Sequence, residues 1–338
     1  MNTLCLPPNE ESIALAAKLL KEGEVVAFPT ETVYGLGANA LNESAVRAIF
    51  SAKERPADNP LIVHVSGKEQ LDGLCQVTDT AKKLMDAYWP GPLTMLLMKT
   101  DAVPAVTTAS LPSVAVRCPN HPVARALIEA CQLPIAAPSA NRSGRPSPTT
   151  AAHVFEDMEG RIPLILDGGA CQVGVESTVV DLTGDMPCVL RPGAITARMI
   201  ADVAGDCAVA SSVMRPLKEG EAAPSPGMRH RHYAPKAKMT VYVGENEKTA
   251  QAIIARYDQA DNAVILAHES AVPLFGNRRV YSLGDTPREG AHLLFKRLRE
   301  MDETGCDVIL AQGWKAEGEA LAVMNRMARA AAFDIVDV

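Results

Sequence analysis

The stretch from Glu24 to Gly37 reads EVVAFPTETVYGLG, an apolar run followed directly by a polar loop that contains glycine. The run EVVAF is typical of a buried strand, and Pro29 ends it because proline cannot donate to a strand ladder. Before it, residues 10–21 carry apolar side chains at helical spacing, with Asn9 as N-cap and Gly23 after the helix. A helix, a buried strand and a polar loop at the strand's carboxyl end indicate an α/β sheet.

The same alternation of patterns continues to about residue 200. Further helices are expected over residues 42–52 and 79–88. Further strands are expected over residues 61–65, 93–98, 114–117, 134–137, 164–166 and 178–182. Because helices lie between many of these strands, the sequence predicts an α/β domain on a mixed, twisted sheet.

A smaller second unit follows a change in composition near residue 205. Residues 205–228 are rich in Ala, Ser, Pro and Gly, which is typical of a linker. The strands expected after it are apolar on both faces, which predicts a Rossmann-like parallel sheet covered by helices. These strands are expected at 239–243, 263–267, 279–283 and 307–311, with helices at 247–257, 287–301 and 321–331. The predicted boundaries are 1–206 for the first domain, 207–237 for the linker and 238–338 for the second domain.

Charge and composition exclude several classes of protein. Lys and Arg number 33 against 40 Asp and Glu, and the net charge of −7 argues against a general nucleic-acid or membrane-surface binder. No run of about 18 apolar residues and no basic N-terminal patch before an apolar core occurs, so we expect a cytoplasmic protein. The eight cysteines form no CxxC pair, which predicts reduced thiols rather than disulfides or a zinc site.

Polar and small residues follow several of the predicted strands of the first domain. The Walker A, GxSxG and HExxH motifs are absent, and no GxGxxG follows the first strand. Each polar segment alone has a turn or surface explanation, but five of them at strand ends indicate a shared site. The segments are PTETVYGLG (29–37), KERPADNPLIVH (53–64), SVAVR (113–117), AAPSANRSG (136–144), and GVEST (174–178) with LRPG (190–193).

Two cations in the second of these segments have two possible interpretations. Lys53 and Arg55 close a predicted helix, where cations suit the helix dipole, so simple C-capping explains them. With Asn59 nearby they can also bind phosphate, because a guanidinium binds phosphate oxygens bidentately and an ammonium neutralises charge. His64, inside a strand, is more simply explained by the sequence as a half-buried histidine with a satisfied ring, and contact with a ligand is the alternative.

The order of these motifs resembles the YrdC-like family of threonylcarbamoyl-AMP synthases, in the long form with a C-terminal domain. The family's Lys-x-Arg and Ser-x-Asn signatures are met at Lys53/Arg55 and Ser139/Asn141. The resemblance covers nearly the whole chain. The other matching segments are WPGPLT (89–94), VAVRCPNHP (114–122), VESTVVD (175–181), LRPGAIT (190–196), SPGMRHRHYAPK (225–236) and AVMNRMARAA (322–331).

The resemblance implies a nucleotidyltransferase that makes L-threonylcarbamoyladenylate and pyrophosphate from L-threonine, bicarbonate and ATP. Its product supplies N6-threonylcarbamoyladenosine at position 37 of tRNAs through tRNA-modifying partner proteins. A carbamate formed from threonine and bicarbonate attacks the α-phosphorus, so catalysis depends on positioning and charge neutralisation. Mg²⁺ is expected on the triphosphate, held by nucleotide and water rather than by protein side chains.

The resemblance also assigns residues, with Lys53 and Arg55 as the catalytic pair and Lys53 on the phosphates. Threonine would be held by Thr32, His64, Arg117 and Ser177. ATP would be contacted by Lys53, Arg55, Asn59, Ser113, Ser139, Asn141, Ser147, Arg191 and Tyr233. As a hypothesis, the linker forms a lid over the pocket mouth through Arg229, Arg231, His232 and Tyr233. The C-terminal domain would steady that lid or receive a partner.

Three alternatives compete with this interpretation. A non-catalytic RNA- or nucleotide-binding module of the same fold is opposed by the acidic charge balance and by only 4% aromatic residues, and we expect no strong direct nucleic-acid binding. A carbamoyl-transfer domain of hydrogenase maturation would be expected with acylphosphatase and zinc-finger segments. An unrelated ATPase or kinase would be expected to carry a phosphate loop.

Overall fold

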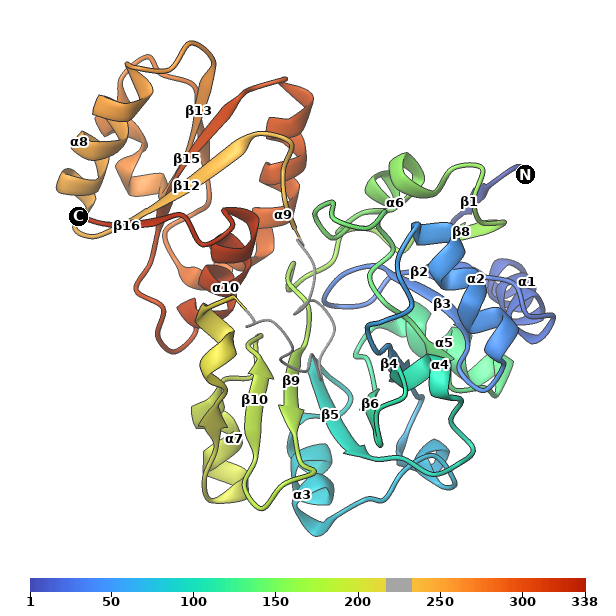
Figure 1. The fold of residues 1–338 in the computed structure, drawn as a ribbon. Helices are drawn as coiled ribbons and strands as arrows, with labels where there is room; N and C mark the ends of the chain where they lie inside the picture. The colour runs from blue at the N-terminus through green and yellow to red at the C-terminus, as the bar shows by residue number, and fades with distance from the viewer. Residues whose placement is uncertain (217–232) are drawn as a thin grey trace.

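The computed structural model describes residues 1–216 and 233–338, which form two α/β units (Figure 1). The first unit has an 11-stranded mixed sheet of order β1-β8-β2-β3-β7-β4-β6-β5-β9-β10-β11. The second has a five-stranded sheet of order β14-β13-β15-β12-β16, in which every pair is parallel. The predicted fold class, a mixed sheet followed by a smaller parallel α/β unit, is confirmed.

The elements of the first unit follow its alternating sequence pattern. Its strands are β1 (Leu4–Leu6), β2 (Val26–Phe28), β3 (Gly35–Asn39), β4 (Ile62–His64), β5 (Leu93–Met98), β6 (Ser113–Arg117), β7 (Ile135–Ala136), β8 (Leu164–Leu166), β9 (Thr178–Asp181), β10 (Cys188–Arg191) and β11 (Ala208–Val209). Its α-helices are α1 (Glu10–Lys21), α2 (Glu43–Lys53), α3 (Asp79–Tyr88), α4 (Ala105–Thr108), α5 (Pro122–Cys131), α6 (Ala151–Met158) and α7 (Ala197–Ala204).

The second unit contains the expected βα series. Its strands are β12 (Lys238–Val243), β13 (Ala263–Ala267), β14 (Val280–Ser282), β15 (Val308–Gly313) and β16 (Ile335–Asp337). Its helices are α8 (Asn246–Tyr257), the 3₁₀ helix η3 (Glu269–Phe275), α9 (Pro287–Glu303) and α10 (Ala320–Ala330). In β13, Val264 and Leu266 join one buried cluster while Ile265 joins another, so the strand is buried on both faces as its sequence predicts.

Local chemistry explains where α1 and α2 begin and end. Asn9 and Ser12 form a capping box at the start of α1, and Asn42 accepts from the backbone N–H of Ala45 at the start of α2. Glu54 adopts a left-handed conformation directly after Lys53, which ends α2. The starts of both helices are therefore fixed by capping side chains that can be recognised in the sequence.

Strand β3 was not predicted, because its sequence GLGAN looks like a loop. It pairs antiparallel with β2 and continues into a pairing with β7. A Cβ added at Gly37 would lie 2.7 Å from the Phe28 ring and 2.8 Å from Ile135. Glycine is needed there because these neighbours pack directly against the backbone. The sequence patterns also did not predict β1, β10, β11, β16, α4, α5, α6 and α7.

Part of the predicted linker belongs to the first unit. Strand β11 pairs parallel with β10, and the 3₁₀ turn Ser211–Met214 follows it. In the second unit, α9 and α10 face the first unit (Figure 1), and Val33 and Val175 of the first unit join their apolar cluster. Within the two described ranges, every helix is too short or too polar to cross a lipid bilayer.

Candidate functional site

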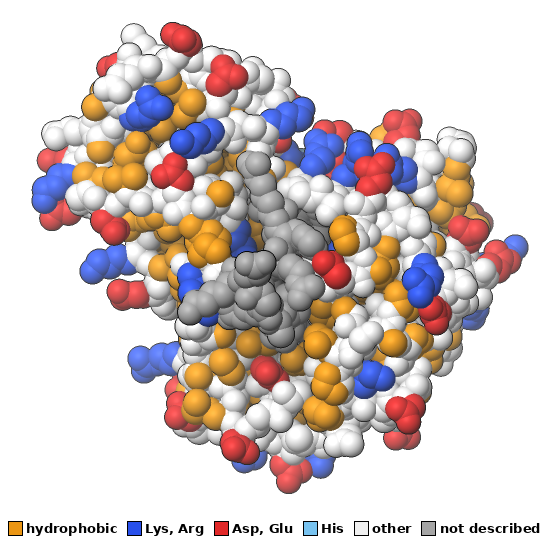
Figure 2. All heavy atoms as spheres, viewed as in Figure 1, with side chains coloured by type: hydrophobic (Ala, Val, Ile, Leu, Met, Phe, Trp, Pro, Cys, Tyr) orange, Lys and Arg blue, Asp and Glu red, His pale blue; other side chains and the backbone are white. Residues whose placement is uncertain are grey.

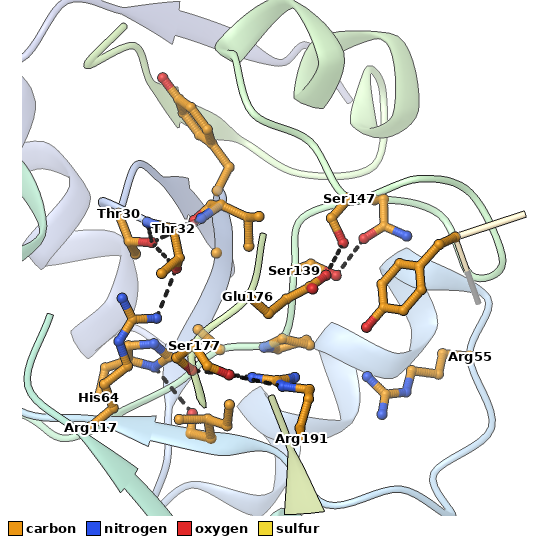
Figure 3. A pocket seen from close by; sticks show the side chains of 18 residues that line it. Thr30, Thr32, Arg55, His64, Arg117, Ser139, Ser147, Glu176, Ser177 and Arg191 are labelled. Atoms are coloured by element: carbon orange, nitrogen blue, oxygen red, sulfur yellow. Dashed lines mark hydrogen bonds between the residues drawn. The ribbon is translucent and has the colours of Figure 1, made fainter. Parts of the chain in front are cut away.

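A polar cavity lies where several strands of the large sheet end (Figure 3). Its walls come from the loop after β2, the ends of β4, β6 and β10, the loop after β7 and the residues before β9. Segments far apart in the sequence therefore share one cavity, whose lining runs from Thr30 to Tyr233. The sequence-predicted residues that line it are Thr32, Arg55, His64, Arg117, Ser139, Asn141, Ser147, Ser177, Arg191 and Tyr233.

Arg117 is held rigidly at one side of this cavity. Its Nη1 donates to Thr32 Oγ1 at 2.9 Å, and its Nη2 lies 2.6 Å from Glu31 Oε1. Both side chains of the ion pair are buried. Glu31 stands within the PTETVYGLG motif but was not predicted, and it neutralises the charge that Arg117 brings into the cavity. This side is therefore polar and preorganised rather than strongly cationic.

His64 lies beside Arg117 as a neutral imidazole. Burial, reinforced by the Arg117 charge, lowers the pKa of His64 to about 3. Its Nδ1 is 3.2 Å from the carbonyl oxygen of Ile62, and its ring meets Phe28 edge to face. The ring is thus fixed in orientation and does not become protonated at neutral pH.

Arg191 and Ser177 form the floor of the cavity (Figure 3). Arg191 Nε donates to the Ser177 carbonyl at 3.0 Å, and its Nη2 donates to Ser177 Oγ at 3.1 Å. Thr94 Oγ1 is 2.8 Å from the same Ser177 hydroxyl. Burial lowers the pKa of Arg191 to about 10, which leaves the guanidinium charged at neutral pH.

Arg55 presents donors that the described chain does not satisfy. Its Nε and Nη2 are buried and have no hydrogen-bond partner among residues 1–216 and 233–338. Burial lowers the pKa of Arg55 to about 10, so the side chain is a desolvated cation at neutral pH. Asn59 is fully buried, and both of its amide atoms likewise lack a partner within those ranges. Because Arg55 lines the cavity, its unsatisfied donors are suited to an anionic ligand, which would replace the lost water.

Lys53 lies behind the cavity wall instead of on it. Its buried Nζ donates to the carbonyl oxygens of Ser139 and Asn141, and Ser139 Oγ in turn donates to Asn141 Oδ1 at 2.5 Å. Burial, reinforced by Arg55, holds the pKa of Lys53 well below its usual range. In this position Lys53 shapes the Ser139–Asn141 loop, and its expected contact with phosphate stays a prediction.

Two further predicted residues lie outside the cavity lining. Ser113 begins β6, at the opposite end of the strand from Arg117, and its backbone pairs with Met98. It is thus placed away from the edge of the sheet where the other residues meet. Asn59 lies behind the lining, in the loop that connects Arg55 to β4.

Glu176 is a cavity residue that the sequence reasoning missed. It lines the cavity, where its Oε1 accepts from Ser147 Oγ at 2.5 Å and its Oε2 accepts from Arg326 Nε at 2.9 Å. Burial alone would raise the pKa of Glu176, but Arg326 and Arg191 outweigh burial and lower it. The GVEST motif contained the signal, because a carboxylate stands beside the predicted Ser177.

Tyr233 lines the cavity from the side of the second unit. Its ring stacks on Phe295 with centroids 5.1 Å apart, and the Arg326 guanidinium lies 6.0 Å from its ring centre. The other predicted lid residues, Arg229, Arg231 and His232, lie outside the described residues.

The cavity offers little to a protein-bound metal. Across the part of the chain that the structure describes, no group of three His, Cys, Asp or Glu side chains is placed to hold a metal ion. Glu176, a carboxylate of the lining, is already bonded to Ser147 and Arg326.

Comparison with known proteins finds relatives of one family over both units. Residues 18–193 match the family model described as "Telomere recombination", and residues 195–332 match that of the threonylcarbamoyl-AMP synthase C-terminal domain. The chain is 48% identical over 333 residues to the threonylcarbamoyl-AMP synthase of Pyrococcus abyssi, covering 97% of this chain and 96% of that protein. It is 46% identical over 334 residues to the Bacillus subtilis enzyme, covering 96% and 94% of the two chains.

Solved structures agree in fold over the full length. The crystal structure of P. abyssi Sua5 complexed with L-threonine has a TM-score of 0.91 at 46% identity, and the match covers 100% of this chain and 99% of that chain. A second P. abyssi Sua5 structure, of a variant with two alanine substitutions, has a TM-score of 0.93 at 46% identity and covers 100% and 98%. With both units matched, the chain belongs to the threonylcarbamoyl-AMP synthase family of enzymes.

Proposed function

We propose that this enzyme forms L-threonylcarbamoyl-AMP and pyrophosphate from L-threonine, bicarbonate and ATP in the cavity. The observation that carries the proposal is the pairing of two environments in one cavity. The buried cations Arg55 and Arg191 form the first environment, and neutral His64 with the compensated Arg117 forms the second. A triphosphate needs the first environment, and a zwitterionic amino acid needs the second.

The amino acid would bind between β4 and β6. His64 offers a ring that stays neutral, so it can accept a hydrogen bond without repelling an ammonium group. Thr32 and Ser177 offer hydroxyl groups, and Arg117 offers donors to a carboxylate. A P. abyssi relative has been crystallised in complex with L-threonine, which supports threonine as the amino acid, and the residues named here are our assignment.

The nucleotide would bind toward Arg55 and Arg191. The unsatisfied Nε and Nη2 of Arg55 suit phosphate oxygens, and the Ser139–Asn141 loop offers further polar groups. Tyr233 offers an aromatic face beside them. Mg²⁺ carried by the triphosphate would offset part of its charge, and the chain's own role is to bind and orient the phosphates.

The reaction requires no covalent bond to the protein. The threonine amine and bicarbonate give a carbamate and water, and a carbamate oxygen then forms a bond to the α-phosphorus. The bond from that phosphorus to the bridging oxygen of the β-phosphate breaks, and pyrophosphate leaves. Arg55 and Arg191 would stabilise the charge that shifts onto the phosphate oxygens, while burial of the cavity limits access of water to the mixed anhydride. The product would then serve tRNA-modifying proteins that form N6-threonylcarbamoyladenosine at position 37.

Pyrophosphate release measured with substrates added singly and together tests this function. We expect release from ATP only when L-threonine and bicarbonate are both present, and an adenylate of the expected mass in the same mixture. Release that depends on neither would contradict the proposal and favour a nucleotide-binding module. Figure 2 bears on that alternative, because Lys and Arg side chains are interspersed with Asp and Glu over the visible face of both units, unlike the basic stripe of a nucleic-acid binder.

A further inference from the structure

We propose that Arg326, from the second unit, is a positioning residue of the cavity: by neutralising Glu176, it allows the cavity to accept the triphosphate of ATP. This inference rests on the proposed function, since it assumes that the anionic ligand is a nucleotide. It assigns the second unit a part in the catalytic cavity itself, beyond a lid support or a partner-binding module.

Arg326 projects from α10 into the boundary between the two units and is completely buried. Its Nε donates to Glu176 Oε2 at 2.9 Å, and its Nη2 donates to the Glu176 carbonyl at 3.2 Å. Its Nη1 donates to the Pro192 carbonyl at 2.6 Å. One side chain of the second unit thus fixes the residues that adjoin Ser177 and Arg191 in the chain.

A second arginine of the same unit holds the other partner of Glu176. Arg299 of α9 donates to the Pro146 carbonyl at 2.6 Å and to Asp157 Oδ2 at 2.6 Å, and both charged side chains are buried. Pro146 precedes Ser147, whose hydroxyl donates to Glu176. The hydrogen bond between Ser147 and Glu176 is therefore supported from both ends by the second unit.

The charge of Glu176 makes this contact important for an anionic ligand. A carboxylate that lines the cavity repels a triphosphate unless a cation compensates it, and in a buried site such repulsion is only weakly screened. Among residues 1–216 and 233–338, two cations face Glu176: Arg326 from α10 and Arg191 from the end of β10. The Ser147 hydroxyl and the Tyr233 phenol of the same ranges also face it.

Without Arg326, Arg191 would be the counter-charge for Glu176 that remains within the described part of the chain. A guanidinium drawn to Glu176 is less able to bind phosphate. The loss of Arg326 would therefore weaken nucleotide binding in two ways, through repulsion from Glu176 and through the diversion of Arg191. A residue that merely joined the two units would produce neither effect.

ATP affinity of the full chain, measured by calorimetry, tests the inference in R326M, E176Q/R326M and the control R278M. Arg278 pairs with Asp258 on the surface of the second unit, outside the described cavity lining. We expect R326M to bind ATP about tenfold or more weakly, because the buried carboxylate of Glu176 loses one of its counter-charges and draws on Arg191. The double variant should recover most of the loss, and R278M should bind like the wild type.

The pH dependence of ATP affinity shows whether Arg326 acts by compensating the charge of Glu176 or only by holding the two units together. In R326M, Glu176 has lost a counter-charge and should take up a proton on acidification. The ATP affinity of R326M should therefore improve between pH 8 and 5 relative to that of the wild type. The midpoint of the affinity–pH curve should differ between the two proteins by about one pH unit or more. If R326M does not fold, R326Q, which keeps a donor toward Glu176 without the charge, takes its place in the same comparison.

Three outcomes overturn the inference: wild-type ATP affinity in folded R326M, no recovery in E176Q/R326M, or identical pH profiles for R326M and wild type. A failure of the proposed function can be told apart from a failure of this inference, because it would be seen in the activity of the wild type. A wild type that binds ATP but releases no threonine-dependent pyrophosphate contradicts the reaction and leaves the Arg326 comparison valid. A wild type that does not bind ATP contradicts both.

Discussion

His64 and Arg117 are partners in register across the parallel pair of β4 and β6, and each is the last residue of its strand. Because parallel strands end at the same edge of a sheet, both side chains reach one cavity. The Arg117 charge adds to burial in keeping His64 neutral. The sheet therefore places a fixed cation and an uncharged ring side by side, a combination suited to a zwitterionic ligand.

The low pKa of His64 predicts a loss of stability in acid. Its folded-state pKa of about 3 lies below the usual 6.5, so the unfolded chain binds the proton more readily between these values. This stability is present above pH 6.5 and is lost as the pH falls toward 3, by about 2 kcal/mol at pH 5. H64Q should therefore lose less unfolding free energy than the wild type between pH 7 and 5, as measured by urea titration.

His153 and His268 have pKa values lowered to about 4, mainly by burial, and both remain in H64Q. Their contribution cancels in the comparison. An equal decline in the two proteins would show that His64 accepts a proton in the folded state.

Arg55 is expected to be essential for turnover but not for folding. R55A removes buried donors that have no partner among the described residues, so the unfolding free energy should be unchanged or higher. The rate of threonine- and bicarbonate-dependent pyrophosphate release should fall about 100-fold or more. R47A, which removes an exposed arginine paired with Glu43 on α2, is the matched control and should keep full activity. A normal rate in R55A would place the phosphates elsewhere.

Lys53 is expected to act on the fold of the site. K53M leaves the carbonyl groups of Ser139 and Asn141 without their buried donor, which should cost about 2 kcal/mol of unfolding free energy. Denaturant titration measures this, with K82M as a control because Lys82 pairs with Asp79 on the surface. A K53M protein of normal stability that cannot bind ATP would instead support direct contact between Lys53 and phosphate.

Gly193 is expected to be irreplaceable because of the strand it touches. A Cβ at this position would lie 2.8 Å from the carbonyl carbon of Ser177 and would meet the backbone nitrogen of Thr178. G193A should displace Ser177, raise the KM for threonine and destabilise the protein by about 1–3 kcal/mol. G184A, whose Cβ would meet nothing within 4 Å, is the control. Equal threonine KM values in the two variants would contradict the proposed place of Ser177 at the amino acid.

The sequence patterns predicted elements whose signals are local. Helices α1 and α3 and strands β5, β8 and β13 have the predicted bounds, because their apolar spacing and caps lie within a few residues. Strand β3 was not predicted because the need for glycine at Gly37 arises from contacts with Phe28 and Ile135, which lie on other strands. Short helices such as α4 escaped because four residues carry little periodicity.

The motifs alone determined which residue types stand at the ends of the strands, since each motif lies directly beside an apolar run. Tertiary structure decided the rest. It turned Lys53 toward two carbonyl groups, left Ser113 at the far end of β6, and joined Glu31 to Arg117 and Glu176 to Arg326. The last of these pairs spans 150 residues. The physical reason is that a buried charge is stable only beside a partner, and the partner's identity depends on how distant segments pack.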